Sequence, residues 1–257
     1  MRRRLTITLA LATLGALLAA ASATAVLTAP DGNTQSILAN VSPNRLSKKK
    51  PAPVTLEVTT KTTSATNPTG VPVPAVQAII DFDKHTSIFS RGYPTCSLAE
   101  IQNTSTETAL RVCKRAKIGS GNATALIPVG VQVFVEHLTV TAFNGQPQGR
   151  KPVILLHSYG RAPVQTTTVL TGVVSNYDRE GYGPRLNVKI PLIAGGLGAL
   201  TEFHTAIFKR FAYKGVKRSY VSSTCPATKK LKSRGKFVFE DGESLTPTSV
   251  QRCVPKG

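Results

Sequence analysis

Short runs in which apolar and polar residues alternate constrain the fold of this chain more than any other feature. Val54, Leu56 and Val58 alternate with polar residues, and a similar alternation runs through 76–82. A period of two places successive side chains on opposite faces of an extended strand, so each run predicts a half-buried strand. Glycine, proline, asparagine and aspartate separate the runs, as they do at turns between strands.

The remaining runs predict an all-β fold, because the sequence lacks the long amphipathic helices that alternate with strands in an α/β fold. About ten short strands favour an antiparallel β-sandwich from residue 54 to residue 257. Asn144-Gly145 and Asp241-Gly242 are typical of hairpin turns. Two packed β-subdomains that divide near 144–151 are the alternative. Further strands are expected at 123–127, 131–143, 153–157, 166–174, 186–190, 200–211, 219–223 and 236–240.

The alternation changes phase within the run 131–143. Valines occupy alternate positions from 131 to 135, and the apolar positions then become Leu138 and Val140. An unbroken pleat would move the apolar residues to the other face, so a β-bulge is expected near Glu136.

The stretch 96–121 interrupts the strands with a short helical insert. Ser97 and Glu100 have the spacing of a capping box, in which the two residues satisfy each other's backbone amides, and Thr104 with Glu107 repeats it. The glycines that follow lack the lysine and helix of a phosphate-binding loop. We therefore expect a cap on one edge or end of the sandwich.

Four cysteines indicate two disulfides, because the number is even and the chain is predicted to be exported. Separation in sequence favours Cys96 with Cys113 and Cys225 with Cys253, while the other two connectivities stay open. A bond across the insert would stabilise the fold by about 3 kcal/mol, through the entropy of the unfolded chain. No Cys-x-x-Cys motif occurs, so structural bridges are preferred to redox-active cysteines.

The amino-terminal residues predict export. Three arginines precede an uncharged apolar run, and residues 21–23 have the small-x-small form that signal peptidase recognises. A secretory signal peptide over 1–23 is preferred to a membrane anchor, because the run is short for spanning. Residues 24–53 are expected to form a flexible leader, and no transmembrane segment is expected after cleavage.

The chain is strongly basic, with a formal net charge of +19 at pH 7, of which the predicted signal supplies three charges. Ten basic residues between Lys209 and Lys236 have no acid among them. Such a run favours acidic wall polymers or other anionic surfaces, although a solvated surface is the alternative. Nucleic acid is disfavoured because the aromatics within the run, Phe211, Tyr213 and Tyr220, are too few and no known motif occurs. The predicted anion-binding residues are Lys229, Lys230, Lys232, Arg234 and Lys236.

The string 153–160 resembles the strand and oxyanion loop of an α/β-hydrolase. However, no Gly-x-Ser-x-Gly nucleophile elbow follows it, so that type of enzyme is not supported. The sequence therefore predicts no catalytic residue and no cofactor.

Two groups of polar residues lie on predicted strands where a site could form. Asp81, Asp83 and His85 share a strand face and could hold a metal, but a solvent-facing polar edge is the preferred interpretation. Glu202 and His204 are expected to form a structural hydrogen-bonded pair. No histidine has the spacing of a zinc site, so no metal ligand is predicted.

Several short motifs resemble a group of uncharacterised exported β-rich proteins of actinobacteria. The motifs are Pro94-Thr95-Cys96, Cys113-Lys-x-Ala116, 118–121, Phe143-Asn144-Gly145, Tyr182-Gly183-x-x-Leu186 and Ile190-Pro191. The resemblance implies an extracellular or envelope protein and carries no known activity. We expect a secreted, non-catalytic protein that binds acidic envelope or extracellular polymers. A secreted hydrolase whose site assembles only in three dimensions is the competing hypothesis.

Overall fold

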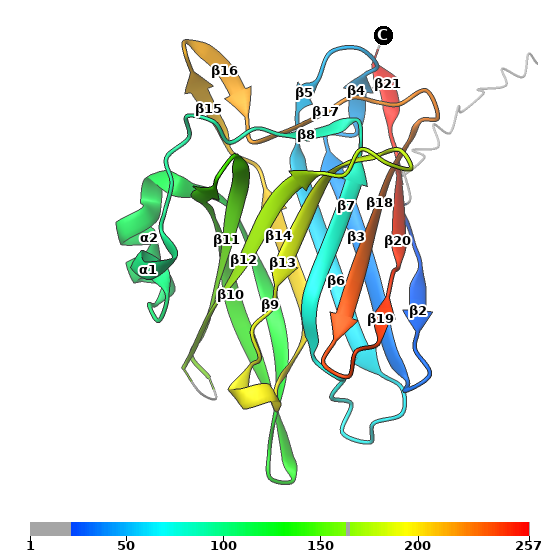
Figure 1. Cartoon of the computed structure of the whole chain (residues 1–257), viewed down its shortest axis with the longest axis vertical. Coiled ribbons are helices and arrows are strands. Elements are labelled where there is room, and N and C mark those ends of the chain that lie inside the picture. Colours follow the sequence, from blue (N-terminus) through cyan, green and yellow to red (C-terminus); the bar gives the residue numbers. More distant parts are fainter. Residues whose placement is uncertain (1–21, 163–164, 257) are drawn as a thin grey trace, which may run out of the picture.

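The computed structural model describes residues 22–162 and 165–256, so all but the last two residues of the predicted signal lie outside it. The chain is mostly strand, and its main sheet is antiparallel, nearly closed and barrel-like rather than a plain sandwich (Figure 1). The strands follow the order β1 (Ala23–Thr24), β20 (Thr248–Arg252), β18 (Lys230–Phe239), β7 (Ala75–Asp83), β13 (Tyr182–Lys189), β12 (Thr166–Asn176), β11 (Lys151–Gly160), β10 (Gln132–Gln148), β9 (Lys117–Val129), β14 (Ala199–Ile207), β6 (Thr55–Ser64), β3 (Asn33–Ser42) and β2 (Val26–Thr28).

Smaller elements complete the fold. Strands β15 (Arg210–Tyr213) and β16 (Val216–Ser219) form a hairpin. A three-stranded sheet has the order β5 (Ala52–Pro53), β17 (Val221–Ser223) and β8 (Thr86–Ile88), and β21 (Val254–Lys256) pairs with β4 (Arg45–Ser47). Strand β19 (Ser244–Leu245) pairs with β18, and the helical elements are α1 (Leu98–Ile101), α2 (Thr106–Cys113), η1 (Lys114–Ala116) and η2 (Ala194–Gly196). Among the described residues, no helix has both the length and the apolar character that crossing a membrane would require.

The predicted alternation places the core inside the curled sheet. In β18, Leu231 and Phe237 are buried in the interior, whereas Lys230 and Lys236 are exposed on the outer face. The side chains that face the interior of the curled sheet are almost all apolar. This follows from the alternation, because every second residue of each strand faces inward. The sheet also pairs continuously through β10 and β11, so it does not divide near 144–151.

Side chains and a short segment close the seam between β3 and β20. The backbone amide of Ala39 donates to Ser249 Oγ (3.1 Å), and that of Val41 donates to Gln251 Oε1 (2.7 Å). Residues 23–28 cross the seam, because β1 pairs with β20 and β2 pairs with β3. These bonds satisfy strand edges that would otherwise be open to pairing with another chain.

Residues 24–53 do not form the flexible leader expected from the sequence. Strand β3 pairs with β6 over its full ten residues, and its alternate side chains are buried. Two of its inward positions are polar: Asn33 accepts a hydrogen bond from the Val73 amide (3.1 Å), and Gln35 accepts one from Thr62 Oγ1 (2.7 Å). Because the first two of its five inward positions are polar, the start of this strand lacks the apolar alternation that identified the others.

The expected β-bulge near Glu136 is also wrong. The pairing of β9 with β10 continues without a shift from Gln132 to Ala142. Val131 and Val135 are exposed near the tip of this hairpin, and Glu136 occupies a buried inward position. The valines lie at the projecting end of the hairpin, so their apolar character does not mark the inward face.

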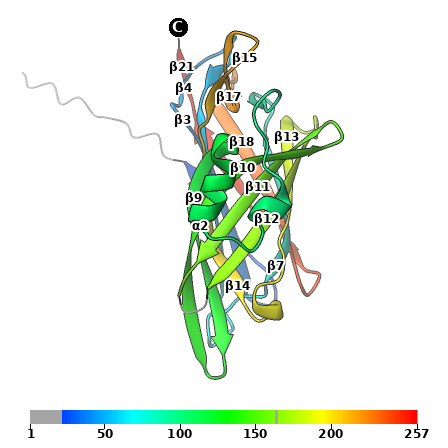
Figure 2. The same cartoon turned by 90° about the vertical axis from the view of Figure 1, so that its left-hand side faces the viewer.

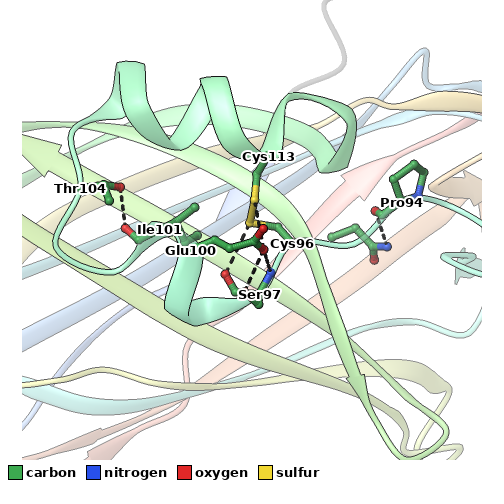
Figure 3. The surroundings of a disulfide bond; sticks show 8 residues. Pro94, Cys96, Ser97, Glu100, Ile101, Thr104 and Cys113 are labelled. Atoms are coloured by element: carbon green, nitrogen blue, oxygen red, sulfur yellow. Dashed lines mark hydrogen bonds between the residues drawn. A yellow bond between two sulfur atoms is a disulfide. The ribbon is translucent and has the colours of Figure 1, made fainter.

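Both predicted disulfides are present, Cys96–Cys113 and Cys225–Cys253. At the start of α1 the Glu100 carboxylate accepts a hydrogen bond from the Ser97 amide (2.7 Å), as a capping box requires (Figure 3). The second cap lies one residue later than expected.

Ser105 begins α2, its Oγ accepting from the amide of Thr108 (3.3 Å). Thr104 instead donates to the carbonyl oxygen of Ile101 (2.8 Å), the residue at which α1 ends.

The helical insert covers the outer face of the sheet rather than an edge or end (Figure 2). It packs over β10 and β11, where it forms a second apolar core that includes Ile101, Ala109, Phe143 and Leu155. The insert is therefore held by packing as well as by its disulfide. Thr104, in the loop between the helices, also accepts hydrogen bonds from the outer face of the sheet through its carbonyl oxygen.

One of these donors, His157, should make the stability of the protein depend on pH. His157 is fully buried, and its Nε2 donates to the Thr104 carbonyl oxygen (2.9 Å). Burial lowers the pKa of His157 despite the opposing effect of this bond. Below about pH 6.5, His157 takes up a proton in the unfolded chain but stays neutral in the folded protein. The free energy of unfolding therefore falls as pH decreases below that value.

Replacing His157 with glutamine should remove this dependence and retain an amide donor for Thr104. The difference in unfolding free energy between the native protein and His157→Gln, measured by urea denaturation, should shrink from about pH 8 to about pH 5. The other histidines are common to both proteins. A difference that stays constant with pH would contradict the prediction.

Candidate binding surface at the basic end of the sheet

The antiparallel topology sorts the connections between strands into two ends with very different charge. One end, which we call the basic end, contains connections 43–54, 84–95, 149–150, 177–181 and 208–229 together with residues 253–256 (Figure 1). Its cations are Arg45, Lys48, Lys49, Lys50, Lys84, Arg91, Arg150, Arg179, Lys209, Arg210, Lys214, Lys217, Arg218, Lys229 and Lys256.

The opposite end contrasts sharply with the basic end. Its connections are 29–32, 65–74, 130–131, 161–165, 190–198 and 240–247. Their sequence contains one cation, Arg161, together with the acids Asp31, Glu240, Asp241 and Glu243. The fold therefore concentrates positive charge from distant parts of the sequence at one end, which raises the local potential for anions.

The basic run from 209 to 236 does not form one patch. Its first half lies on and beside the hairpin β15–β16 at the basic end, and its second half lies along β18. In β18 the predicted anion-binding residues alternate on the outer face, but two of them have intramolecular partners. Lys232 Nζ donates to the Glu180 carbonyl oxygen, and Arg234 binds carboxylates. Lys229, Lys230 and Lys236 form no salt bridge within the described residues.

Asp81 lies at the centre of a charged row across three strands. Arg185 of β13 and Arg234 of β18 are its direct neighbours in register on either side. Arg185 binds both carboxylate oxygens (Nε–Oδ1 2.6 Å, Nη2–Oδ2 2.9 Å), and Arg234 Nε donates to Oδ2 (2.9 Å). Burial alone would raise the pKa of Asp81, but the bonds and charges of the two arginines outweigh it and lower the pKa.

The preferred interpretation of Asp81 and Asp83 as a solvent-facing polar edge is therefore wrong. Both carboxylates are buried, at 2% and 5% exposure, although they lie on the outer face of β7. The two arginines that bind Asp81 lie over tyrosines: the Arg185 guanidinium is 3.7 Å from the centre of the Tyr177 ring, and that of Arg234 is 4.5 Å from the centre of the Tyr182 ring. This cluster has matched charges and serves the fold.

The metal and catalytic combinations do not assemble in the described residues. Asp83 Oδ1 accepts from His85 Nδ1 (2.7 Å), but this pair lies outside the groove described below. The described Cys, His, Asp and Glu residues give one possible metal cluster, Cys96 with Glu100 and Cys113, whose sulfurs are already joined in a disulfide.

The other candidate pair and the hydrolase-like string also have structural explanations. His204 Nδ1 lies 2.9 Å from Thr59 Oγ1, and Glu202 pairs with Lys61 (3.4 Å). The expected pair of Glu202 and His204 is therefore replaced by bonds to their partners on β6. The string 153–160 is β11, a strand inside the main sheet.

An aromatic cluster fixes the projecting hairpin β15–β16 at the basic end. Phe211 stacks on Phe89 (6.0 Å between ring centres), and its ring centre lies 4.8 Å from that of Tyr93. Tyr213 contacts Phe89 edge-on (5.6 Å), and Arg218 lies over the same Phe89 ring (5.4 Å). The hairpin therefore presents its cations from a position fixed by ring packing.

An open groove of about 720 Å³ lies at the basic end, between residues 88–95 and the turn from β10 to β11. Buried Asn144 supports it from below: its Nδ2 donates to the carbonyl oxygens of Tyr93 (3.2 Å) and Pro94 (3.0 Å), and its Oδ1 accepts from Tyr220 (3.0 Å). Arg91 and Arg150, both exposed, line the groove.

The cations around the groove are available to a ligand. Within the described residues, no salt bridge involves Arg91, Arg150 or Arg218, the last of which lies over the groove-lining ring of Phe89. Exposed unpaired guanidinium and ammonium groups keep their donors for a ligand. The sequence did not identify this set, because its members are far apart in the chain and only the strand order brings their loops together.

Comparison of the chain with protein-family models, curated proteins and solved structures finds no match. The resemblance to exported actinobacterial proteins therefore stays a prediction.

Proposed function

We propose that this is an extracellular or envelope-associated protein that binds acidic polymers through its basic end. The observation that carries the proposal is the concentration of unpaired cations there, around an open groove, opposite an end that is nearly free of cations. The predicted signal peptide and the two disulfides support an exported location.

The groove suits repeated phosphate or carboxylate groups. Arginine donates through a planar fork that matches both anions, and Arg91 and Arg150 both line this groove. Contacts with exposed cations are screened by salt, because the Debye length falls to about 10 Å at 0.1 M. Binding that uses the basic end should therefore weaken steeply as ionic strength rises.

Charge reversal in the groove tests the proposal. Arg91→Glu combined with Arg150→Glu should weaken binding to an acidic wall polymer, such as a polyphosphodiester, at least about tenfold, which corresponds to about 1.4 kcal/mol. The matched control is Lys189→Glu with Lys236→Glu, which makes the same change in net charge on exposed positions far from the basic end. Affinity would be measured by titration at low salt and at high salt.

The outcome also separates the basic end from the stretch along β18 that the sequence indicated. Equal losses in the two double variants would contradict a localised site and leave only general attraction by net charge. Lys229→Glu with Lys230→Glu addresses the part of β18 nearest the basic end. Lys232 and Arg234 are unsuitable for this purpose, because their replacement would also disturb Glu180 and Asp81.

A further inference from the structure

An apolar cavity of about 80 Å³ lies inside the curled sheet. Its walls are inward-facing side chains of β6, β7, β18 and the strands β11 to β14, including Val58, Ile80, Leu156, Leu170 and Phe203. Tyr220 and Val221 contribute to its wall from the connection at the basic end. The cavity and the groove share one lining residue, Ile88, and are otherwise lined by different side chains.

The cavity offers a ligand almost no polar partner. No lysine, arginine, histidine, aspartate or glutamate lines it, and its side-chain hydroxyls are those of Thr60, Thr205 and Tyr220. The Tyr220 hydroxyl is already bonded to Asn144 Oδ1 (3.0 Å). Thr205, 8% exposed, is the notable exception, because its Oγ1 has no hydrogen-bond partner within the described part of the chain.

The width of the sheet accounts for the cavity. An eight-stranded barrel is just filled by its own side chains, and the interior widens as strands are added. Thirteen strands on this path enclose more width, and small inward residues such as Ala78 leave part of it unfilled. Protein interiors are normally packed with few voids larger than a water molecule, so an unfilled space of this size is an exception.

We infer that this cavity is a binding site for a small, uncharged, apolar molecule with at most one polar group. An apolar cavity gains little from water, and an engineered cavity of about 150 Å³ in another protein stays dry and binds benzene or xenon. The present cavity, of about 80 Å³, is smaller, so it suits a hydrocarbon of a few carbon atoms or a single xenon atom. A hydroxyl on such a molecule would satisfy Thr205, whereas a charged group would be buried without a partner.

Xenon provides a direct probe, with ¹²⁹Xe NMR as the measurement on the full-length folded protein. The native protein should show a saturable xenon shift, which Ala78→Leu should abolish by filling the space. Leu170→Ala should enlarge the cavity and raise xenon occupancy severalfold. A native protein without a saturable shift, or the same shift in all three proteins, would overturn the inference.

The role of Thr205 is tested with a pair of small ligands of similar size, ethanol and propane. Thr205→Val keeps the volume nearly unchanged and removes the hydroxyl. Preference for the alcohol over the alkane should be lost in this variant, while xenon binding is retained. If Ala78→Leu fails to fold, the saturable shift of the native protein decides the matter, because a Leu→Ala change creates a xenon site in a filled core as well. Loss of xenon binding in Thr205→Val would contradict the assigned role of the hydroxyl.

Discussion

Asp81→Asn should lower the free energy of unfolding by about 3 kcal/mol, because it leaves Arg185 and Arg234 without the carboxylate between them. The asparagine has a similar shape but no charge, and it cannot accept the three strong bonds that the carboxylate accepts. Arg234 would keep its contact with Glu180, which limits the loss on that side. Chemical denaturation of the folded protein gives the measurement.

An exposed pair of the same chemistry supplies the control. Arg161 and Glu107 form a salt bridge (2.6 Å), but both side chains are 69% exposed. Exposed pairs contribute little, because water and salt screen them and ordering two long side chains costs entropy. Glu107→Gln should therefore leave stability nearly unchanged. A loss as large as that of Asp81→Asn would show that burial is not what makes the Asp81 row important.

The same row should make the protein sensitive to acid. The pKa of Asp81 is lowered in the folded state, so its contribution is fully present above the unfolded value of about 3.9. That contribution is lost as pH falls through the lower folded pKa. Asp81→Asn should therefore reduce the loss of stability between about pH 4 and about pH 2. An unchanged acid transition would contradict the assignment.

Gly121→Val should be at least as damaging, with an expected loss of about 3 kcal/mol or more. A side chain at Gly121 would overlap the backbone carbonyl of His204 on the paired strand β14, and one at Gly119 would overlap that of Ala206. Backbone cannot rotate away as a side chain can, so the two strands would have to separate. Overpacking inside a well-packed region costs about 1–3 kcal/mol and occasionally more.

The adjacent residue gives a matched control in the same strand. Asn122 is exposed, so Asn122→Val adds the same side chain without entering the interface. Thermal unfolding should show a large decrease in midpoint for Gly121→Val and little change for Asn122→Val. Similar midpoints for the two variants would show that β9 and β14 can move apart at small cost.

The sequence predicted strands well wherever one face was uniformly apolar. It failed at β3, whose inward positions include Asn33 and Gln35, and at β10, whose exposed valines suggested a false change of phase. In both cases the partners that explain the residue lie elsewhere in the chain, such as Thr62 for Gln35. Local alternation cannot reveal such partners.

The candidate binding surface, too, could be predicted from the sequence only in part. A basic run was visible in the sequence, but the cations at the groove include Arg91 and Arg150, which stand outside that run. Arg234, inside the run, turned out to be a structural partner of Asp81. Charge counting indicated the sign of the partner and could not separate free cations from those already used by the fold.

The sequence by itself determined the β-class and the helical insert and favoured the disulfide pairing that the structure shows, because alternation, cysteine spacing and a capping box are local signals. Only the tertiary structure decided that the sheet curls until its edges meet and that the insert covers its outer face. It also decided which charges are buried, since Asp81 meets Arg185 and Arg234 across separations of 104 and 153 residues. Contacts over such distances depend on strand order and register, which no local pattern encodes.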